Sequence, residues 1–333
     1  GDWYQGSADA TRQNLQHFGE DWDEILILCG DQLYHMDFQA VLANHRATGA
    51  DASICALPVS DRDATSMGIM QLDDTGRIVR FVEKPPADKL KGLESPDEIF
   101  ERFGVDGTGR PYLASMGIYV FNKRLLYNEL RAHKHVDFGK DLFPAVLNKC
   151  RVQPFVFDGY WEDIGTVKSF HEANLAMTQG VAPFEFRTEK GVVYTRSRTL
   201  PATKAIKLET NQSIVSEGCV IKGAKLDNSI LGLRSIVGEN VRLKRCVVMG
   251  ADYYENDAQK LENRRLGRPD VGFGDNIEIE NAIVDKNARI GSNVVIKNPE
   301  KVAQQQSDAV VVRDGVICVV KNAVIPSGTK LGV

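Results

Sequence analysis

The sequence has 333 residues, of which 43% are hydrophobic and 26% are charged, and its formal net charge is −4. This length allows two domains with separate cores. The charge balance gives no basic surface for nucleic acid, and no apolar run is long enough to span a membrane. Six cysteines are scattered singly without a CxxC pair, which argues against a disulfide framework or a cysteine-based zinc site and fits a reducing compartment.

The first half of the chain begins with a predicted helix through Ala10, Leu15 and His17, for which we expect Ser7 or Asp9 to be the N-cap. The continuous apolar run Ile25–Cys29 then predicts a buried parallel strand, which ends at Gly30 and Asp31. Open α/β sheets bind ligands at the carboxyl ends of central strands, so Asp31 is a candidate catalytic residue. The alternative is that this Gly-Asp pair only forms a turn.

Strand and helix patterns then alternate, which predicts a parallel or mixed α/β sheet. Residues 87–109 are charged and contain glycine, so we expect them to form an exposed excursion. The further elements predicted for this domain are a helix Phe38–Ala47, a strand Ser53–Val59, a hairpin of Gly68–Leu72 with Ile78–Val82, a strand Tyr112–Phe121, helices Lys123–Ala132 and Lys140–Asn148, and a strand Val152–Phe157.

Polar residues stand where several of these elements end. Pro85 and Pro86 hold the preceding residues extended, which would present Glu83 and Lys84 from a strand end, although a Glu-Lys pair is more often a solvated surface. Ser115 lies in a strand that contains a glycine, a residue that often marks close approach of a ligand. Asp163 precedes a helix that Thr166 can cap, which makes it a second candidate carboxylate.

The pattern changes after Gly180. We expect residues 181–212 to form a linker, and from about Ser213 apolar residues recur at intervals of six, as at Ile214, Val220 and Leu226. A six-residue period predicts a left-handed parallel β-helix with three short strands in each coil, here over residues 213–333 with a polar insertion at 251–270. A β-sandwich would instead alternate with period two.

The motifs, taken together, resemble those of bacterial and plant ADP-glucose pyrophosphorylase, also called glucose-1-phosphate adenylyltransferase. This resemblance implies a Rossmann-like nucleotidyltransferase domain over residues 1–180, incomplete at its N-terminus, followed by the left-handed β-helix. It also implies the reaction of ATP with α-D-glucose 1-phosphate to give ADP-glucose and pyrophosphate in glycogen or starch synthesis. It covers nearly the whole chain and rests on WYQGSADATRQ (3–13), ILCGDQLYHMD (27–37), FVEKP (81–85), ASMGIYVF (114–121), DFGKDLFP (137–144), YWEDIGT (160–166), ILGLRS (230–235), GADYYE (250–255), IVDKNARIG (283–291) and VVKNAVIPSG (319–328).

The resemblance also implies roles for individual residues. Such a transfer needs positioning and cations rather than a covalent nucleophile, and Mg²⁺ prefers carboxylates together with phosphates and water. Asp31 and Asp163 match the family's metal-binding aspartates, and Lys84 matches the lysine that holds the sugar phosphate. The residues that match substrate contacts are Glu83 and Ser115 for glucose, and Gln5 and Gly6 for adenine.

Regulation and assembly are implied in the same way. Lys286, Arg289 and Lys321 fall on the family's effector-binding motifs for phosphorylated metabolites, where they have no obvious carboxylate partner apart from nearby Asp285. The family forms homo- or hetero-tetramers in the cytoplasm or the plastid stroma. We expect structural roles for the remaining candidates, which are packing or surface positions for His35 and His171, a helix cap for Asp137, and packing of the insertion for Tyr253 and Tyr254.

One family motif is absent from the sequence. The Gly-rich loop that cradles the ATP phosphates has no counterpart, and the run at 104–109 lies in the predicted excursion. We therefore expect a chain truncated at its N-terminus, whose activity needs the missing segment. Two alternatives are a non-catalytic regulatory or assembly subunit and a pyrophosphorylase that uses GTP or UTP.

Overall fold

A computed structural model describes residues 3–19, 21–188, 191–298 and 302–332. The chain divides into two compact units, one comprising residues 1–30 and 34–161 and the other residues 31–33 and 162–333. Among the described residues, no helix combines the length and the apolar character that crossing a membrane requires.

The first unit is built on a mixed β-sheet. Its strands lie in the order β5-β4-β6-β3-β7, and β1 pairs with the end of β6. Strands β3 and β7 run parallel, whereas the other neighbours are antiparallel. This agrees with the predicted parallel or mixed sheet. The strands are β1 (Glu24–Ile27), β3 (Ala52–Val59), β4 (Gly68–Leu72), β5 (Ile78–Glu83), β6 (Tyr112–Asn122) and β7 (Val152–Val156).

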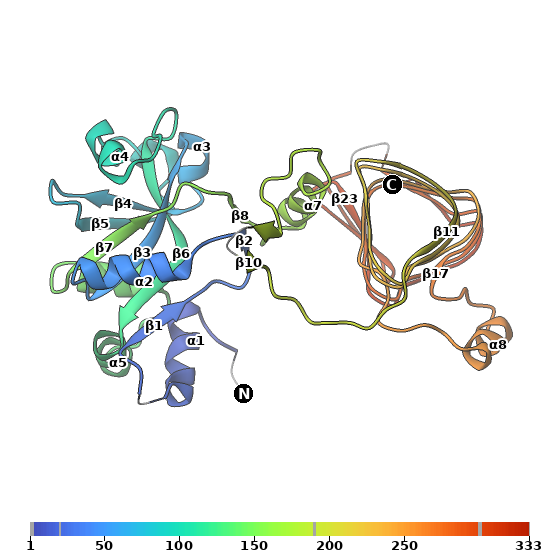
Figure 1. Cartoon of the computed structure of the whole chain (residues 1–333), viewed down its shortest axis with the longest axis horizontal. Helices are drawn as coiled ribbons and strands as arrows, with labels where there is room; N and C mark the ends of the chain where they lie inside the picture. The colour runs from blue at the N-terminus through green and yellow to red at the C-terminus, as the bar shows by residue number, and fades with distance from the viewer. Residues whose placement is uncertain (1–2, 20, 189–190, 299–301, 333) are drawn as a thin grey trace. The chain divides into compact units, whose positions relative to one another are not determined.

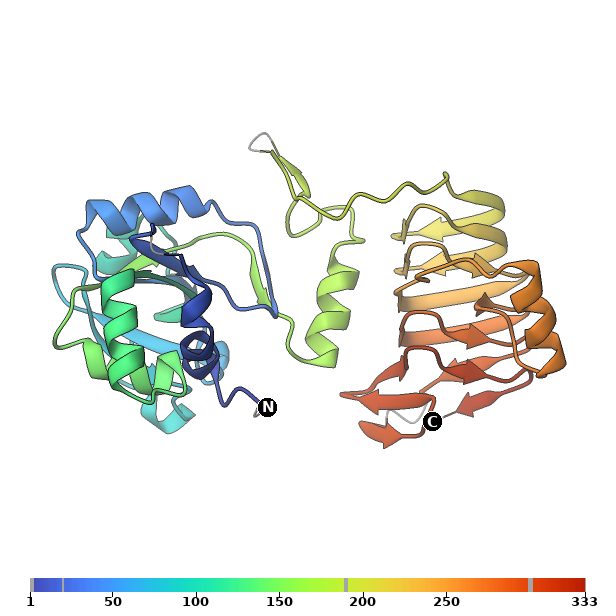
Figure 2. The same ribbon diagram turned by 90° about the horizontal axis from the view of Figure 1, so that it is seen from below.

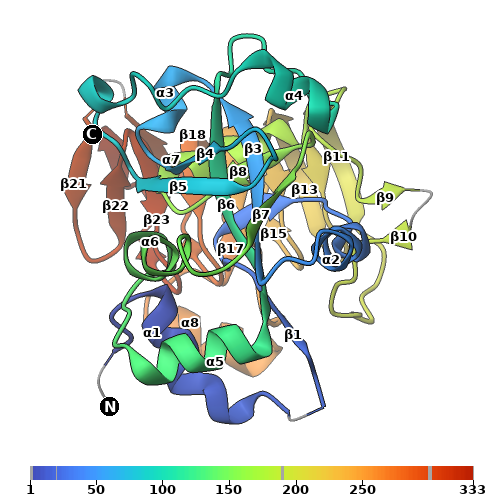
Figure 3. The same cartoon turned by 90° about the vertical axis from the view of Figure 1, so that its left-hand side faces the viewer.

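Helices cover both faces of this sheet. Helix α2 (Phe38–Ala47) packs Val41 against Met116 and Ile118, and Figure 1 shows it lying across the strands. The opposite face is covered by α1 (Ser7–Asn14) and α5 (Lys123–Ala132), which lie side by side in Figure 3, and by α6 (Phe143–Val146). The N-terminus of α2 is capped by Asp37, whose side chain accepts from the amide of Gln39 at 2.9 Å. The cap predicted from Ser7 or Asp9 for the first helix was wrong, because Gly6 occupies the N-cap position of α1 and makes no side-chain cap. Short segments in this unit are η1 (Leu15–His17) and α3 (Asp61–Ala64).

The prediction for the Ile25–Cys29 strand was wrong in direction and position. Strand β1 is antiparallel to β6, with Ile25 opposite Phe121, and it ends at Ile27. Only one face of it is well covered, and Leu28 is 44% exposed. An apolar run indicates that a strand is buried but does not specify the strand with which it pairs. In the structure β6 pairs with β3, β4 and β1. Asp31 therefore does not follow a central strand.

The predicted exposed excursion at residues 87–109 was also wrong. It contains η2 (Ala87–Lys89) and α4 (Asp97–Phe103), and its side chains Leu90, Leu93 and Phe100 are buried. These few apolar residues pack against the sheet although the charged residues between them face solvent.

The helical segment predicted over Lys140–Asn148 begins and ends earlier in the chain than predicted. A π-helical turn η3 (Phe138–Leu142) precedes α6, which ends at Val146. The reason is the cap, since the Asp137 carboxylate accepts from the amides of Gly139 and Lys140 at 2.8 and 3.1 Å. The predicted capping role of Asp137 is thus confirmed.

The second unit is a parallel β-helix preceded by α7 (Val167–Ala176). Figure 1 shows its triangular cross-section and Figure 2 its stacked coils. Residues that face each other on successive coils are in register, as Leu226, Leu243 and Ile279 are, and they form one continuous core. The strands are β11 (Lys204–Asn211), β12 (Ile214–Val215), β13 (Val220–Asp227), β14 (Ile230–Leu231), β15 (Ile236–Val237), β16 (Val241–Val248), β17 (Gly272–Phe273), β18 (Ile277–Val284), β19 (Arg289–Ile290), β20 (Val295–Lys297), β21 (Gln304–Gln306), β22 (Val310–Arg313), β23 (Val316–Val319), β24 (Val324–Ile325) and β25 (Lys330–Gly332).

The β-helical sheet includes part of the predicted linker. Strand β11 lies within residues 181–212, yet it pairs in parallel with β13, and Leu208 lies opposite Ala224 in this pairing. The same stretch also holds the short hairpin of β9 (Arg187–Thr188) and β10 (Gly191–Val192). The β-helix thus begins earlier in the chain than the six-residue apolar period indicates.

Helix α7 begins as the sequence predicts and packs on the β-helix. The Thr166 side chain accepts from the Ser169 amide in a capping box. His171 is buried, with Nε2 2.8 Å from the Arg245 carbonyl oxygen, and the Arg245 guanidinium donates to Glu172 at 2.7 Å. The predicted packing role of His171 is confirmed.

The insertion at 251–270 contains α8 (Asp257–Arg265) and is fixed by a buried ion pair. Arg289 donates to Glu255 Oε1 at 2.6 Å, and both side chains are at most 10% exposed. The Glu255 carboxylate also accepts from the Val271 amide at 2.7 Å and from the Asn263 side chain at 2.9 Å. Burial opposes ionisation, but these three donors together hold the pKa of Glu255 below its usual value.

Replacing Glu255 should therefore destabilise the protein in a pH-dependent way. The variant Glu255→Gln leaves the buried Arg289 charge without its counter-ion, which costs on the order of 3 kcal/mol of unfolding free energy. A carboxylate with a lowered pKa stabilises the fold above its unfolded pKa near 4.5, and this stabilisation is lost as the pH falls through the folded pKa. Urea unfolding of variant and wild type, from neutral pH to below that value, should show the difference shrinking in acid.

The matched control is Glu262→Gln, which removes an exposed carboxylate of α8 that pairs with Arg265 at 3.7 Å. Surface pairs of this kind contribute about 0–1 kcal/mol. A stability difference for Glu255→Gln that does not change with pH would contradict the ion-pair account.

Candidate active site

Two aspartates that lie far apart in the sequence meet beside one glycine. Strand β2 (Gln32–Tyr34) pairs with β8 (Trp161–Asp163), and the Ile164 amide donates to the Asp31 carbonyl oxygen at 3.0 Å. A Cβ atom on Gly165 would lie 3.0 Å from Asp163 Oδ1 and 3.3 Å from Asp31 Oδ2. Both carboxylates therefore border the same space, which the missing side chain of Gly165 leaves open.

This pair fits a magnesium ion. Both aspartates are exposed, and two neighbouring carboxylates repel each other unless a cation lies between them. Within the described part of the chain, no three His, Cys, Asp or Glu side chains form a metal-binding group. Mg²⁺ is typically held by one or two carboxylates with water and substrate phosphates, so two protein ligands suit it. Asp31 and Asp163 would be the residues that hold it.

The first unit contributes a second cluster around Glu83. The Glu83 carboxylate fits between two glycines, because a Cβ on Gly139 would lie 2.4 Å from its Oε2 and one on Gly68 would lie 2.9 Å from it. Burial and, after it, the nearby Asp137 charge raise the pKa of Glu83. A half-buried carboxylate held in this way can both accept and, when protonated, donate hydrogen bonds to sugar hydroxyl groups.

Lys84 follows Glu83 and has an unusual backbone conformation. Its φ is +46°, in the left-handed region that side chains other than glycine adopt at a cost of about 1–3 kcal/mol. The Lys84 amide donates to the Met67 carbonyl oxygen at 3.0 Å, and the buried Pro85 follows. These contacts fix the main chain while the ammonium group remains exposed, as a phosphate-binding lysine requires.

Ser115 and Tyr119 place two hydroxyl groups on one face of β6. Their oxygens are 3.5 Å apart, and the Gly117 amide donates to Ser115 Oγ at 3.3 Å. Gly117 has a φ of +71°, and the pairing of β3 with β6 shifts register here. Burial is the main cause that raises the pKa of Tyr119, and the negative charges of Glu83 and Asp137 raise it further. Both carboxylates therefore lie close enough to Tyr119 to act on its ionisation.

The predicted adenine segment packs against the chain that precedes Asp137. A Cβ on Gly6 would lie 2.5 Å from the Val136 carbonyl oxygen, so this close approach requires glycine. The Gln5 amide donates to the Asp9 carboxylate at 2.9 Å, and Asp9 is buried. The Ser7 hydroxyl donates to Asp137 at 3.1 Å. The structure thus links the Gln5–Gly6 segment to the cluster around Glu83.

The three effector candidates, which have no carboxylate partner nearby in sequence apart from Asp285, all meet carboxylates that are remote in sequence. Lys286 pairs with Asp252 at 2.8 Å, and Lys321 lies 3.9 Å from the same carboxylate. Arg289 is buried in its ion pair with Glu255. These partners belong to the GADYYE motif at the start of the insertion, more than 30 residues before the cations in the sequence, so sequence distance hides them. Hydrogen bonds from Lys286 and Asn287 lower the pKa of Asp252.

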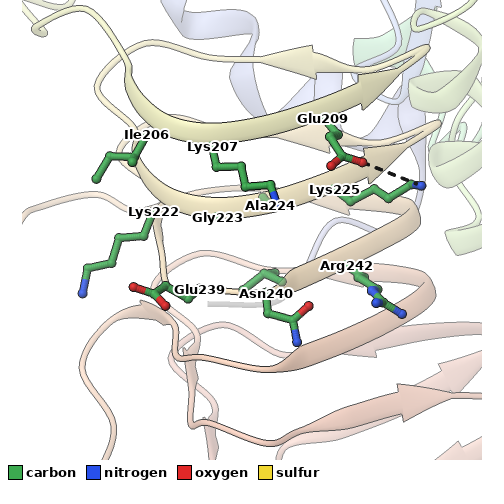
Figure 4. A pocket seen from close by; sticks show the side chains of 11 residues that line it. Ile206, Lys207, Glu209, Lys222, Gly223, Ala224, Lys225, Glu239, Asn240 and Arg242 are labelled. Carbon is green, nitrogen blue, oxygen red and sulfur yellow. Dashed lines mark ion pairs between the residues drawn. The ribbon is translucent and has the colours of Figure 1, made fainter.

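A large hollow lies on one face of the β-helix. It has a volume of about 820 Å³ on the face formed by β11, β13 and β16, and Figure 4 shows its rim of long charged side chains, among them the Lys225–Glu209 ion pair. None of the residues predicted from the sequence lines it. The chemistry of the motifs therefore does not belong to this hollow.

Several residues of these clusters were missed or only partly understood from the sequence. Tyr119, Gly139 and Gly165 were not considered individually, although the last two follow the aspartates of their motifs by two residues. The packing role predicted for the two tyrosines of the insertion is not confirmed, since Tyr253 and Tyr254 are 41% and 42% exposed, although the Tyr254 hydroxyl donates to the Gly218 carbonyl oxygen at 2.7 Å. The role predicted for His35 stays a prediction.

Comparison with known proteins assigns both units. Residues 2–180 match the family described as nucleotidyl transferase, and residues 198–330 match the GLGC left-handed parallel beta-helix domain. The chain is 42% identical over 337 aligned residues to the small subunit of a chloroplastic/amyloplastic glucose-1-phosphate adenylyltransferase from Triticum aestivum, covering 99% of this chain and 71% of that protein. The predicted Rossmann-like nucleotidyltransferase domain with a left-handed β-helix is thereby confirmed, and this chain belongs to the glucose-1-phosphate adenylyltransferase family of nucleotidyltransferases.

Proposed function

We propose that this chain transfers the adenylyl group of ATP to glucose 1-phosphate, giving ADP-glucose and pyrophosphate for glycogen or starch synthesis. The observation that carries the proposal is the convergence of Asp31 and Asp163 beside Gly165, in a chain that also presents Glu83 and Lys84 from a fixed strand end. Family membership supplies the reaction, and these side chains suit its charges.

The chemistry is a substitution at phosphorus. An oxygen of the sugar phosphate bonds to the α-phosphorus of ATP, and the bond to the leaving pyrophosphate breaks. Lys84 offsets the charge of the sugar phosphate, and Glu83 and Ser115 hold the glucose hydroxyl groups. Gln5 and Gly6 contact adenine. Magnesium, when bound by Asp31 and Asp163, neutralises phosphate oxygens and the charge that builds on the leaving group.

Regulation and assembly extend the proposal. The ammonium groups of Lys286 and Lys321 converge on the Asp252 carboxylate, and two converging ammonium groups suit a phosphorylated metabolite that displaces it. Arg289 contributes by holding the insertion rather than by touching the effector, because it is buried against Glu255. A homo- or hetero-tetramer in the cytoplasm or the plastid stroma is the assembly and location that the family suggests, and the wheat relative is a chloroplastic/amyloplastic protein.

The central test is pyrophosphate release with wild type and Asp31→Asn. We expect release with ATP, less with GTP or UTP, and a loss of about two to three orders of magnitude in kcat for Asp31→Asn, with little change in glucose 1-phosphate binding. Asp74→Asn, an exposed carboxylate in the turn between β4 and β5, serves as the control. An unchanged kcat in Asp31→Asn would refute the metal role.

The assay is run on this chain and on a version with a family-type Gly-rich loop placed ahead of it, because that motif is absent from the sequence. Release in neither version would overturn the catalytic proposal and favour the regulatory-subunit alternative. A preference for GTP or UTP would reassign the nucleotide.

Replacing Lys84 should weaken sugar-phosphate binding selectively. Lys84→Gln removes a charge-assisted contact to phosphate, which is worth about 1.5–3 kcal/mol, so KM for glucose 1-phosphate should rise about 10- to 150-fold. KM for ATP should change little. Steady-state kinetics with Lys89→Gln, an exposed lysine of η2, provide the comparison. An equal effect of both substitutions would show that general surface charge, and not a specific contact, is responsible.

A further inference from the structure

The loop at 134–137, which precedes η3, is held against the first turn of α1 by main-chain groups. The Val136 carbonyl oxygen accepts from the amides of Ala8 and Asp9 at 3.0 and 3.1 Å. The neighbouring His135 carbonyl oxygen accepts from the Arg12 side chain at 2.9 Å. The start of α1 and this loop are therefore joined into one hydrogen-bonded unit, although they are remote in sequence.

One side chain of α1 adds a second connection between them. Ser7 is the first residue of the helix and directly follows Gly6, where the predicted adenine segment ends. Its hydroxyl donates to Asp137 Oδ2 at 3.1 Å and accepts from the Phe138 amide at 3.3 Å. Because it donates and accepts at the same time, this hydroxyl bridges the adenine segment to both the side chain and the main chain of the loop's end.

Asp137 continues these contacts toward the glucose side. Its other oxygen, Oδ1, accepts from the amides of Gly139 and Lys140 at 2.8 and 3.1 Å. Gly139 in turn lies so close to Glu83 that a Cβ atom would be 2.4 Å from the carboxylate oxygen Oε2. The two oxygens of one carboxylate thus hold Ser7 on one side and the turn that confines Glu83 on the other.

We propose that Ser7 is a positioning residue that couples binding of the adenine nucleotide to binding of the sugar phosphate. This inference rests on the proposed adenylyltransferase function, in which Gln5 and Gly6 contact adenine and Glu83 contacts glucose. A nucleotide that orders the Gln5–Gly6 segment also orders the Asp137 turn through Ser7, so the second ligand loses less conformational freedom when it binds. The coupling is reciprocal, because both ligands order the same unit.

A purely structural role of Ser7 would have a different signature. Ser7 is exposed, and the main-chain bonds to Val136 remain when its hydroxyl is removed. We therefore expect Ser7→Ala to keep the circular dichroism spectrum of the wild type while it loses the coupling. Ser7→Thr retains the hydroxyl, and an exposed position has room for the added methyl group, so this variant should behave as the wild type.

The test is calorimetric binding of glucose 1-phosphate to the full chain in excess Mg²⁺, with and without α,β-methylene-ATP, whose carbon bridge blocks the transfer. In the wild type each ligand should tighten binding of the other by the same factor, about 5-fold or more. This factor should disappear in Ser7→Ala and return in Ser7→Thr. Thr11→Ala is the matched control, because it removes a hydroxyl of α1 that donates to the Ser7 carbonyl oxygen rather than to Asp137.

Amide hydrogen exchange reports the ordering directly. Exchange in the segment 136–140 should slow when α,β-methylene-ATP binds to the wild type, but not when it binds to Ser7→Ala. Equal coupling in the wild type and Ser7→Ala, or no coupling in the wild type, would overturn the inference. An equal loss in Thr11→Ala would also overturn it, since the stability of α1 would then be responsible.

The outcomes separate this inference from the proposed function. A chain that binds both ligands without coupling through Ser7 retains the adenylyltransferase proposal and rejects only the role of Ser7. A chain that binds neither ligand overturns the adenylyltransferase proposal, and the coupling with it.

Discussion

The pairing of two short strands, β2 and β8, is the constraint on which the candidate active site depends. It joins segments that are remote in sequence, and the backbone hydrogen bond from the Ile164 amide to the Asp31 carbonyl oxygen continues their alignment next to the aspartates. The two aspartates extend from this pairing toward Gly165, whose lack of a side chain keeps the space between them open. The local folding of either segment alone could not create this arrangement. A divalent ion would in turn reinforce the pairing, because it offsets the repulsion of the carboxylates.

Features determined by neighbouring residues could be predicted well from the sequence. The caps at Asp137 and Thr166 follow from side chains that reach amides two or three residues away. The hairpin of β4 and β5 follows from its turn, and the β-helix follows from a repeating period that averages over many coils. In these cases the information needed lies within a short window of sequence.

Features determined by distant partners could not be predicted in the same way. Nothing in the run Ile25–Cys29 specifies that β1 lies antiparallel to β6, and the carboxylates that neutralise Lys286 and Arg289 come from the insertion, which is remote from them in sequence. The β-helix adds a subtler case. At its corners two apolar residues occur together, but Ile221 is buried and its neighbour Val220 is 39% exposed. A six-residue period identifies the corner without deciding which member of the pair turns inward. The site residues themselves were found through whole motifs, since single aspartates and lysines carry little information on their own.

The shared partner of Lys286 and Lys321 has a consequence for ligand selection. Asp252 is covalently part of the chain and always close to both ammonium groups, so it acts as a permanent competitor with a high effective concentration. A singly charged anion gains no more than this carboxylate already provides. A ligand with two or more charges can engage both lysines at once and outcompete it. In the effector site proposed above, the corner would therefore set a threshold of charge and discriminate among anions by valence before any contact to the rest of the ligand is made.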